Sequence, residues 1–104
     1  MFRGTTPTLY FNIKNADLLE IKDIQITIKS YDKTIVKTLN DVNVDEKKKT
    51  ISLDLTQIET LALKEPEALV QLKVLFDDDK IAASKIFKIP IENPLNVKII
   101  ESGI

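Results

Sequence analysis

The chain alternates apolar and polar residues over most of its length, and a period of two is typical of half-buried β-strands. The clearest example is the run Ile24, Ile26 and Ile28, which alternates with polar residues on the opposite face. The same alternation recurs in further segments, at residues 8–13, 34–39, 42–44, 50–55, 70–76 and 81–91. Polar breaks between neighbouring segments favour hairpins at residues 24–39 and 40–55.

One stretch departs from this alternation. Residues 56–59 read Thr-Gln-Ile-Glu, which is the spacing of a capping box. In that motif the threonine hydroxyl accepts from the amide three residues on, and the glutamate side chain returns to the threonine amide. Ile58 and Leu61 follow at helical spacing, and Pro66 cannot continue a helix. We therefore expect one short helix near residues 57–63, at one end of the fold between two sheets.

This order of elements predicts an all-β fold. About seven short strands, separated by turn signals at intervals of roughly eight to twelve residues, are typical of an immunoglobulin-like antiparallel β-sandwich. Because 104 residues is close to the commonest domain size, we expect residues 1–104 to form a single domain. Residues 1–7 and 95–104 lie outside the best-defined strands and are expected to be extended arms. The alternation also predicts five almost fully buried core residues: Ile26, Leu53, Leu72, Val74 and Phe87.

Composition removes several function classes. Charged residues make up 30% of the chain but the net charge is only -1, which argues against nucleic-acid and membrane-surface partners. No apolar run approaches the length of a membrane span or of a leader peptide. The chain has neither cysteine nor histidine, so it lacks the thiol nucleophile and the commonest general base and metal ligand. We expect no enzymatic activity, no cofactor and no metal site.

Two charged runs and one tyrosine are candidate binding or interface sites. Asp77-Asp78-Asp79 is contiguous and lacks the glycine and alternating ligands of a calcium loop, which favours a solvated hairpin turn. Lys47-Lys48-Lys49 has no neighbouring aromatic on which a base could stack, which favours a charged turn. Tyr10 faces away from the side that carries Leu9 and Phe11. An exposed tyrosine there is a candidate interface anchor, although single surface aromatics are also ordinary.

Two short motifs carry a resemblance to known proteins. The chain begins with Phe2-Arg3-Gly4-Thr5-Thr6-Pro7-Thr8 ahead of an alternating strand, and later carries Leu55-Thr56-Gln57-Ile58-Glu59-Thr60-Leu61. This layout resembles a family of small structural proteins encoded among the tail and baseplate genes of tailed phages and prophages of low-GC Gram-positive bacteria. It also resembles the amino-terminal β-sandwich domain of siphophage baseplate upper proteins. The chain departs from the baseplate pattern at Arg3-Gly4-Thr5, which lacks the Gln and Asp found there.

The resemblance implies a non-enzymatic structural protein of the virion, present in the bacterial host cytoplasm during assembly. Its expected partners are itself, as a homo-oligomer, and neighbouring phage tail proteins. Apolar residues near both termini, together with Arg3 and Tyr10, give a set of candidate interface residues: Phe2, Arg3, Tyr10, Leu95, Val97 and Ile99. The alternative is a small surface- or carbohydrate-binding β-sandwich module. Such a module needs an aromatic-lined face, whereas aromatics make up 6% of the chain and tryptophan is absent.

Overall fold

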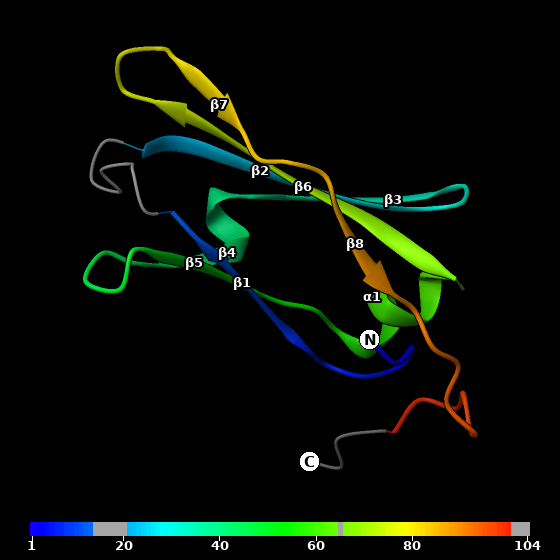
Figure 1. Cartoon of the computed structure of the whole chain (residues 1–104). Coiled ribbons are helices and arrows are strands. Elements are labelled where there is room, and N and C mark those ends of the chain that lie inside the picture. The colour runs from blue at the N-terminus through cyan, green and yellow to red at the C-terminus, as the bar shows by residue number, and fades with distance from the viewer. Residues whose placement is uncertain (14–20, 65, 101–104) are drawn as a thin grey trace.

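Two antiparallel sheets packed face to face make up most of the structure, a computed structural model that describes residues 1–13, 21–64 and 66–100 (Figure 1). The three-stranded sheet has the order β1–β5–β4 and consists of β1 (Thr8–Asn12), β4 (Val42–Asp45) and β5 (Thr50–Asp54). In the five-stranded sheet the order is β3–β2–β6–β7, and β8 also pairs with β6. Its strands are β2 (Ile21–Ser30), β3 (Lys33–Thr38), β6 (Glu67–Phe76), β7 (Ile81–Ala83) and β8 (Phe87–Pro90). The expected all-β, sandwich-like fold is confirmed.

The core lies between the two sheets. Ile26 of β2 is paired in register with Leu72 of β6, and both side chains are buried. Leu53 of β5 is buried from the opposite sheet, so both layers contribute to one apolar cluster. Four of the five predicted core residues are therefore correct: Ile26, Leu53, Leu72 and Val74. The prediction for Phe87 is wrong, because its side chain is 50% exposed.

The segment 81–91 was expected to form one strand, but it forms two. Ala83 pairs with Lys73 and Phe87 pairs with Val70, so four steps along this segment match three steps along β6. The extra residue acts like a β-bulge and reverses which side chains face inward. Ser84 stabilises the interruption between β7 and β8, since its Oγ accepts from the Leu72 amide at 3.0 Å and donates to the Lys85 carbonyl at 2.8 Å. Odd-numbered residues thus face outward in β7 and toward the core side in β8.

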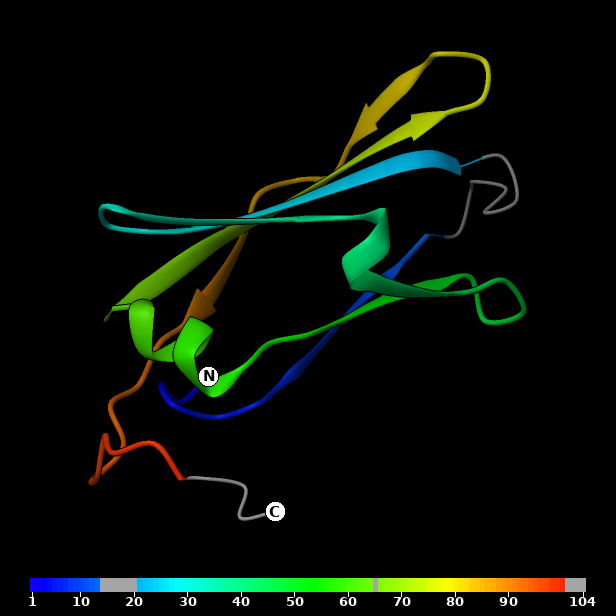
Figure 2. The same ribbon diagram turned by 180° about the vertical axis from the view of Figure 1, so that it is seen from behind.

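Helix α1 (Gln57–Ala62) joins β5 to β6 at one end of the sandwich, as the capping box predicted (Figure 1). Thr56 Oγ1 accepts from the Glu59 amide at 3.1 Å, and Glu59 Oε1 accepts from the Thr56 amide at 2.9 Å. The buried residues at this helix are Thr60 and Leu63, whereas Ile58 is exposed. Figure 2 shows the second crossing between the sheets, where the 3-10 helix η2 (Leu39–Asp41) connects β3 to β4.

The amino-terminal segment is part of the fold. Phe2 forms a parallel bridge with Glu92, in which the Arg3 amide donates to the Glu92 carbonyl at 3.0 Å and the Glu92 amide donates to the Met1 carbonyl at 2.8 Å. Farther along, the Leu55 amide donates to the Pro7 carbonyl at 3.0 Å. Residues 1–7 are therefore not a free arm in this structure. Residues 93–100, the described part of the tail, form no strand.

Candidate interaction surface

The sandwich is open along one side, where β1 of the three-stranded sheet faces the strands that follow β6. A groove of about 390 Å³ lies there. One wall is formed by residues 9–12 of β1, and the other by Val70, Leu72, Ser84, Phe87 and Ile89. Phe87 faces the groove from β8, and no strand of the described chain lies beyond β8 to cover the ring, so the sandwich is open there.

Aromatic side chains gather at this groove. Tyr10, Phe11 and Phe87 line it, which is half of the six aromatic residues in the chain. Tyr10 is 71% exposed, so its expected outward orientation is confirmed. No lining residue is charged. The groove is thus apolar and uncharged, with a tyrosine and a phenylalanine open to solvent at its margins.

A second exposed apolar surface lies on the tail after Pro94. Leu95 is fully exposed, and the side chains of Val97, Ile99 and Ile100 are also exposed. The end of the described tail is held against α1 by one side chain. Gln57 Nε2 donates to the Ile100 carbonyl at 2.7 Å, and the Ile100 amide donates to Gln57 Oε1 at 3.0 Å.

Arg3 and Phe2 occupy the same end of the molecule as the tail. The Arg3 guanidinium donates to the Leu61 carbonyl at 2.7 Å and to Asn93 Oδ1 at 2.9 Å. Arg3 thus ties the amino-terminal segment to the end of α1 and to the beginning of the tail. Phe2 is half exposed beside this link. Both residues have a structural role that the sequence pattern did not indicate.

The structure divides the six candidate interface residues between two places. Five lie near the α1 end: Phe2, Arg3, Leu95, Val97 and Ile99. Tyr10 is separate and lies at the groove. Sequence reasoning missed Phe87, which it assigned to the core; only the position of β8 at the edge of the sheet shows that this ring lies at an open side.

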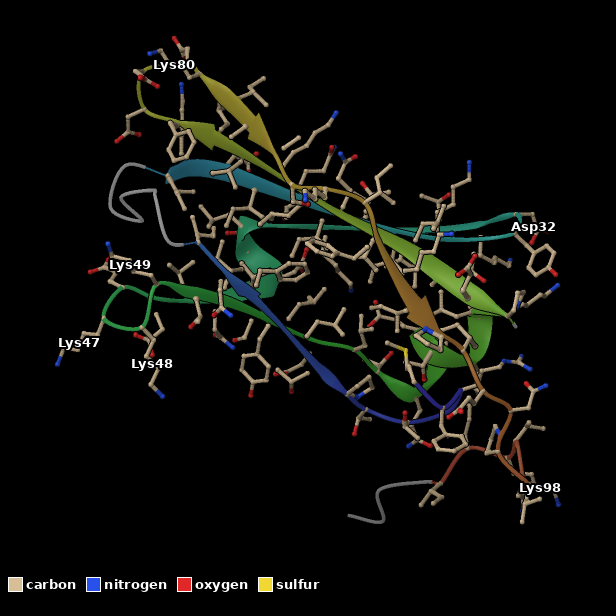
Figure 3. All side chains as sticks on the ribbon, viewed as in Figure 1. Asp32, Lys47, Lys48, Lys49, Lys80 and Lys98 are labelled. Carbon is tan, nitrogen blue, oxygen red and sulfur yellow. The ribbon has the colours of Figure 1, made fainter. Side chains whose placement is uncertain are left out.

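The two charged runs are turns, as expected. Asp45 Oδ1 accepts from the amides of Lys47 and Lys48, each at 3.1 Å, and Asp78 Oδ1 accepts from the Lys80 amide at 3.1 Å. Figure 3 shows the Lys47–Lys49 and Lys80 side chains extending into solvent at one end of the molecule. Over the described ranges, no three residues among His, Cys, Asp and Glu are grouped in a way that could hold a metal ion.

Among the described residues, two carboxylates have shifted pKa values. Burial raises the pKa of Glu59, but an ion pair with Lys37 and hydrogen bonds from Thr56 outweigh it, so the pKa lies below its ordinary value. The Thr38 amide, which donates to Asp41 Oδ2 at 2.9 Å, lowers the pKa of Asp41. Both groups cap helical turns and neither lines the groove, so these shifts indicate structural roles.

Comparison of the sequence with known protein families and with curated proteins found no match. Among the described residues, no helix has the length and apolar character needed to cross a membrane.

Proposed function

We propose that the protein is a non-enzymatic structural protein of a phage or prophage, with an immunoglobulin-like sandwich fold. It acts by protein–protein assembly in a tail or baseplate, within the virion, and is present in the host cytoplasm while particles assemble. Its partners are copies of itself and neighbouring tail proteins. The resemblance of residues 2–8 and 55–61 to small tail and baseplate proteins supports this assignment.

The observation that carries the proposal is the exposed apolar tail. Leu95, Val97 and Ile99 alternate with Asn96 and Lys98, which is the pattern of a strand with one buried face. These apolar side chains are nevertheless exposed, and no strand pairs with the described part of the tail. An extended segment with an unburied apolar face is suited to adding to the sheet edge of a neighbouring protein.

The residue inventory supports a non-enzymatic role. Without histidine or cysteine, acid–base or nucleophilic chemistry would depend on carboxylates, lysines or hydroxyls with strongly perturbed environments. The two carboxylates with shifted pKa values, Glu59 and Asp41, are each engaged in a capping hydrogen bond. The groove has no charged side chain that could serve as a general acid or base.

One observation favours the alternative, a surface- or carbohydrate-binding module. Tyr10 and Phe87 present exposed rings at the groove, and sugar rings pack on aromatic faces. Ser84 Oγ is already bonded within the protein, which leaves the side chains of Tyr10 and Asn12 as the remaining polar groups of the groove. Protein–protein assembly is therefore the better supported function.

The test is whether the protein is part of a particle. Mass spectrometry of density-purified particles from the induced source strain should detect the chain, and its gene should lie among tape-measure, portal or lysis genes. In a complemented deletion strain, replacing Leu95, Val97 and Ile99 with serine should reduce incorporation at least about tenfold, since the apolar face is lost. Replacing the alternate residues Asn96 and Lys98 with serine is the matched control. Particles that lack the wild-type chain would overturn the proposal.

A further inference from the structure

The edge strands of the two sheets differ in how they are protected against pairing with another chain. Natural edge strands commonly carry charges or proline, or are very short. Among the described edges, β3 carries Lys33 and Lys37, β4 carries Asp45, and β8 carries Lys88 and Pro90. Strand β7 is uncharged but has only three residues. Strand β1 alone has five residues, Thr-Leu-Tyr-Phe-Asn, with neither charge nor proline.

The hydrogen bonds of β1 show which backbone groups are free. At its two ends, the Leu55 amide donates to the Pro7 carbonyl at 3.0 Å and the Ile13 amide donates to the Lys49 carbonyl at 2.9 Å. In an antiparallel pair, alternate residues bond to the neighbouring strand, so the odd-numbered residues of β1 bond to β5. The N–H and C=O groups of Thr8, Tyr10 and Asn12 therefore point to the open side. No strand of the described chain pairs with them.

We infer that β1 of a second copy pairs antiparallel with β1 about a two-fold axis at Tyr10. This deepens the proposed function, on which it rests, by naming a second copy as the partner for this edge. The axis sets Tyr10 opposite Tyr10 and sets Thr8 opposite Asn12 of the other copy. The Thr8–Asn12 pair occurs twice by symmetry, so three pairs form in all. Each pair joins residues whose backbone groups point outward, and each therefore exchanges two hydrogen bonds. A register shifted by one residue would set outward groups against inward ones.

The side chains of β1 suit a contact with an identical strand. A two-fold axis sets a surface against itself, so a charged residue near the axis would meet a like charge. The sequence from Thr8 to Asn12 is uncharged and reads polar, apolar, aromatic, apolar, polar from either direction. Tyr10 would form an aromatic cross-strand pair with its copy on the outer face. The partner strand would also lie along the open groove and shield the Phe87 ring.

The size of the contact sets its expected strength. A strand of five residues with one aromatic pair is small compared with the roughly 1,200 Å² buried in stable interfaces. We therefore expect a reversible dimer with a Kd between about 1 µM and 1 mM. Sedimentation velocity across a concentration series detects association in this range.

The test uses the full chain with a charge introduced at the two-fold axis. Because Tyr10 is exposed, Tyr10→Lys and Tyr10→Glu should each fold, with thermal midpoints close to wild type. Each should weaken dimerisation by about tenfold or more, since like charges meet across the axis. An equimolar mixture of the two variants should restore dimers, because only a two-fold contact sets residue 10 opposite itself. Tyr31→Lys, an exposed tyrosine outside the groove, is the matched control and should dimerise like wild type.

Several outcomes would overturn the inference. These are a wild-type chain that remains monomeric up to about 1 mM, a mixture that fails to restore dimers, and a Tyr31→Lys variant as impaired as the Tyr10 variants. Dimers that persist in both Tyr10 variants but disappear after deletion of residues 95–104 would assign the contact to the tail instead. None of these results contradicts the proposed role as a component of the particle, because incorporation into particles is measured separately.

Discussion

Gly4 shows how much of the amino-terminal motif is structural. Its φ of +74° lies in the left-handed region, which side chains with a Cβ rarely adopt. A Cβ on this residue would lie 3.2 Å from Leu61 Cδ2, so space is short as well. The neighbouring Arg3 is bonded to the Leu61 carbonyl. Arg3 and Gly4 of the amino-terminal motif therefore both hold the first turn of the chain against α1.

Replacing Gly4 with alanine should lower stability. The left-handed conformation costs an L-residue about 1–2 kcal/mol, and the new Cβ must also displace the Leu61 side chain. We expect the free energy of unfolding, measured by urea titration, to fall by at least about 1 kcal/mol. Lys98→Ala, on the exposed tail, is the control and should change it by less than about 0.5 kcal/mol. Equal midpoints for Gly4→Ala and wild type would show that the turn relaxes without cost.

Among the secondary-structure elements, the sequence predicted the features that depend on residues close together in the chain. The alternation around Ile26 and the capping box at Thr56 depend on residues a few positions apart, and both predictions are confirmed. The bulge before Phe87 depends on how the segment pairs with β6, so no pattern within 81–91 shows it. The bridge between Phe2 and Glu92 joins opposite ends of the chain and also leaves no local signal. For the same reason the groove was not predictable.

The cap of α1 gives a pH-dependent contribution to stability. Burial raises the pKa of Glu59, but Lys37 and Thr56 lower it overall, so the folded state favours the charged carboxylate. A lowered pKa in the folded state means that the contribution is present above the unfolded pKa of about 4.3 and is lost as pH falls below it. The Lys37 and Glu59 side chains are about one-fifth exposed, so solvent screens the pair only in part.

Glu59→Gln isolates this contribution, because glutamine keeps the reach of the capping box but not the charge. The variant should be less stable than wild type at pH 7, and the difference in urea midpoint should shrink as pH falls from about 5 to 3. Glu46→Gln, in the exposed β4–β5 turn, is the control for removing one carboxylate. A difference that stays constant or grows on acidification would contradict the assigned role of the ion pair.

For the whole molecule, the terminal segments 1–7 and 92–100 differ in how firmly they are held. Residues 1–3 bond to the backbone of residues 90 and 92, and the Pro7 carbonyl accepts from Leu55, which directly follows β5. They also reach α1, where Thr60 Oγ1 donates to the Thr5 carbonyl at 2.8 Å. The described tail beyond residue 94 is tied to the body through Gln57 and Ile100. One end thus joins the sheets to the helix, whereas the other presents apolar side chains to solvent.

Truncation should separate these roles. Removing residues 1–7 deletes seven hydrogen bonds to the rest of the described chain, to Leu55, Thr60, Leu61, Pro90, Asn93 and both backbone groups of Glu92. At about 0.5–1.5 kcal/mol each, their loss should cost about 3 kcal/mol or more, and the thermal midpoint measured by circular dichroism should fall steeply. Removing residues 95–104 should leave the midpoint within about 2 °C, because the apolar side chains of residues 95–100 are exposed. Gln57→Ala, which releases the tail without shortening the chain, should match the second truncation. If the amino-terminal truncation melted like wild type, residues 1–7 would be the free arm that the sequence suggested, and the bonds to residues 90 and 92 would contribute nothing to the fold.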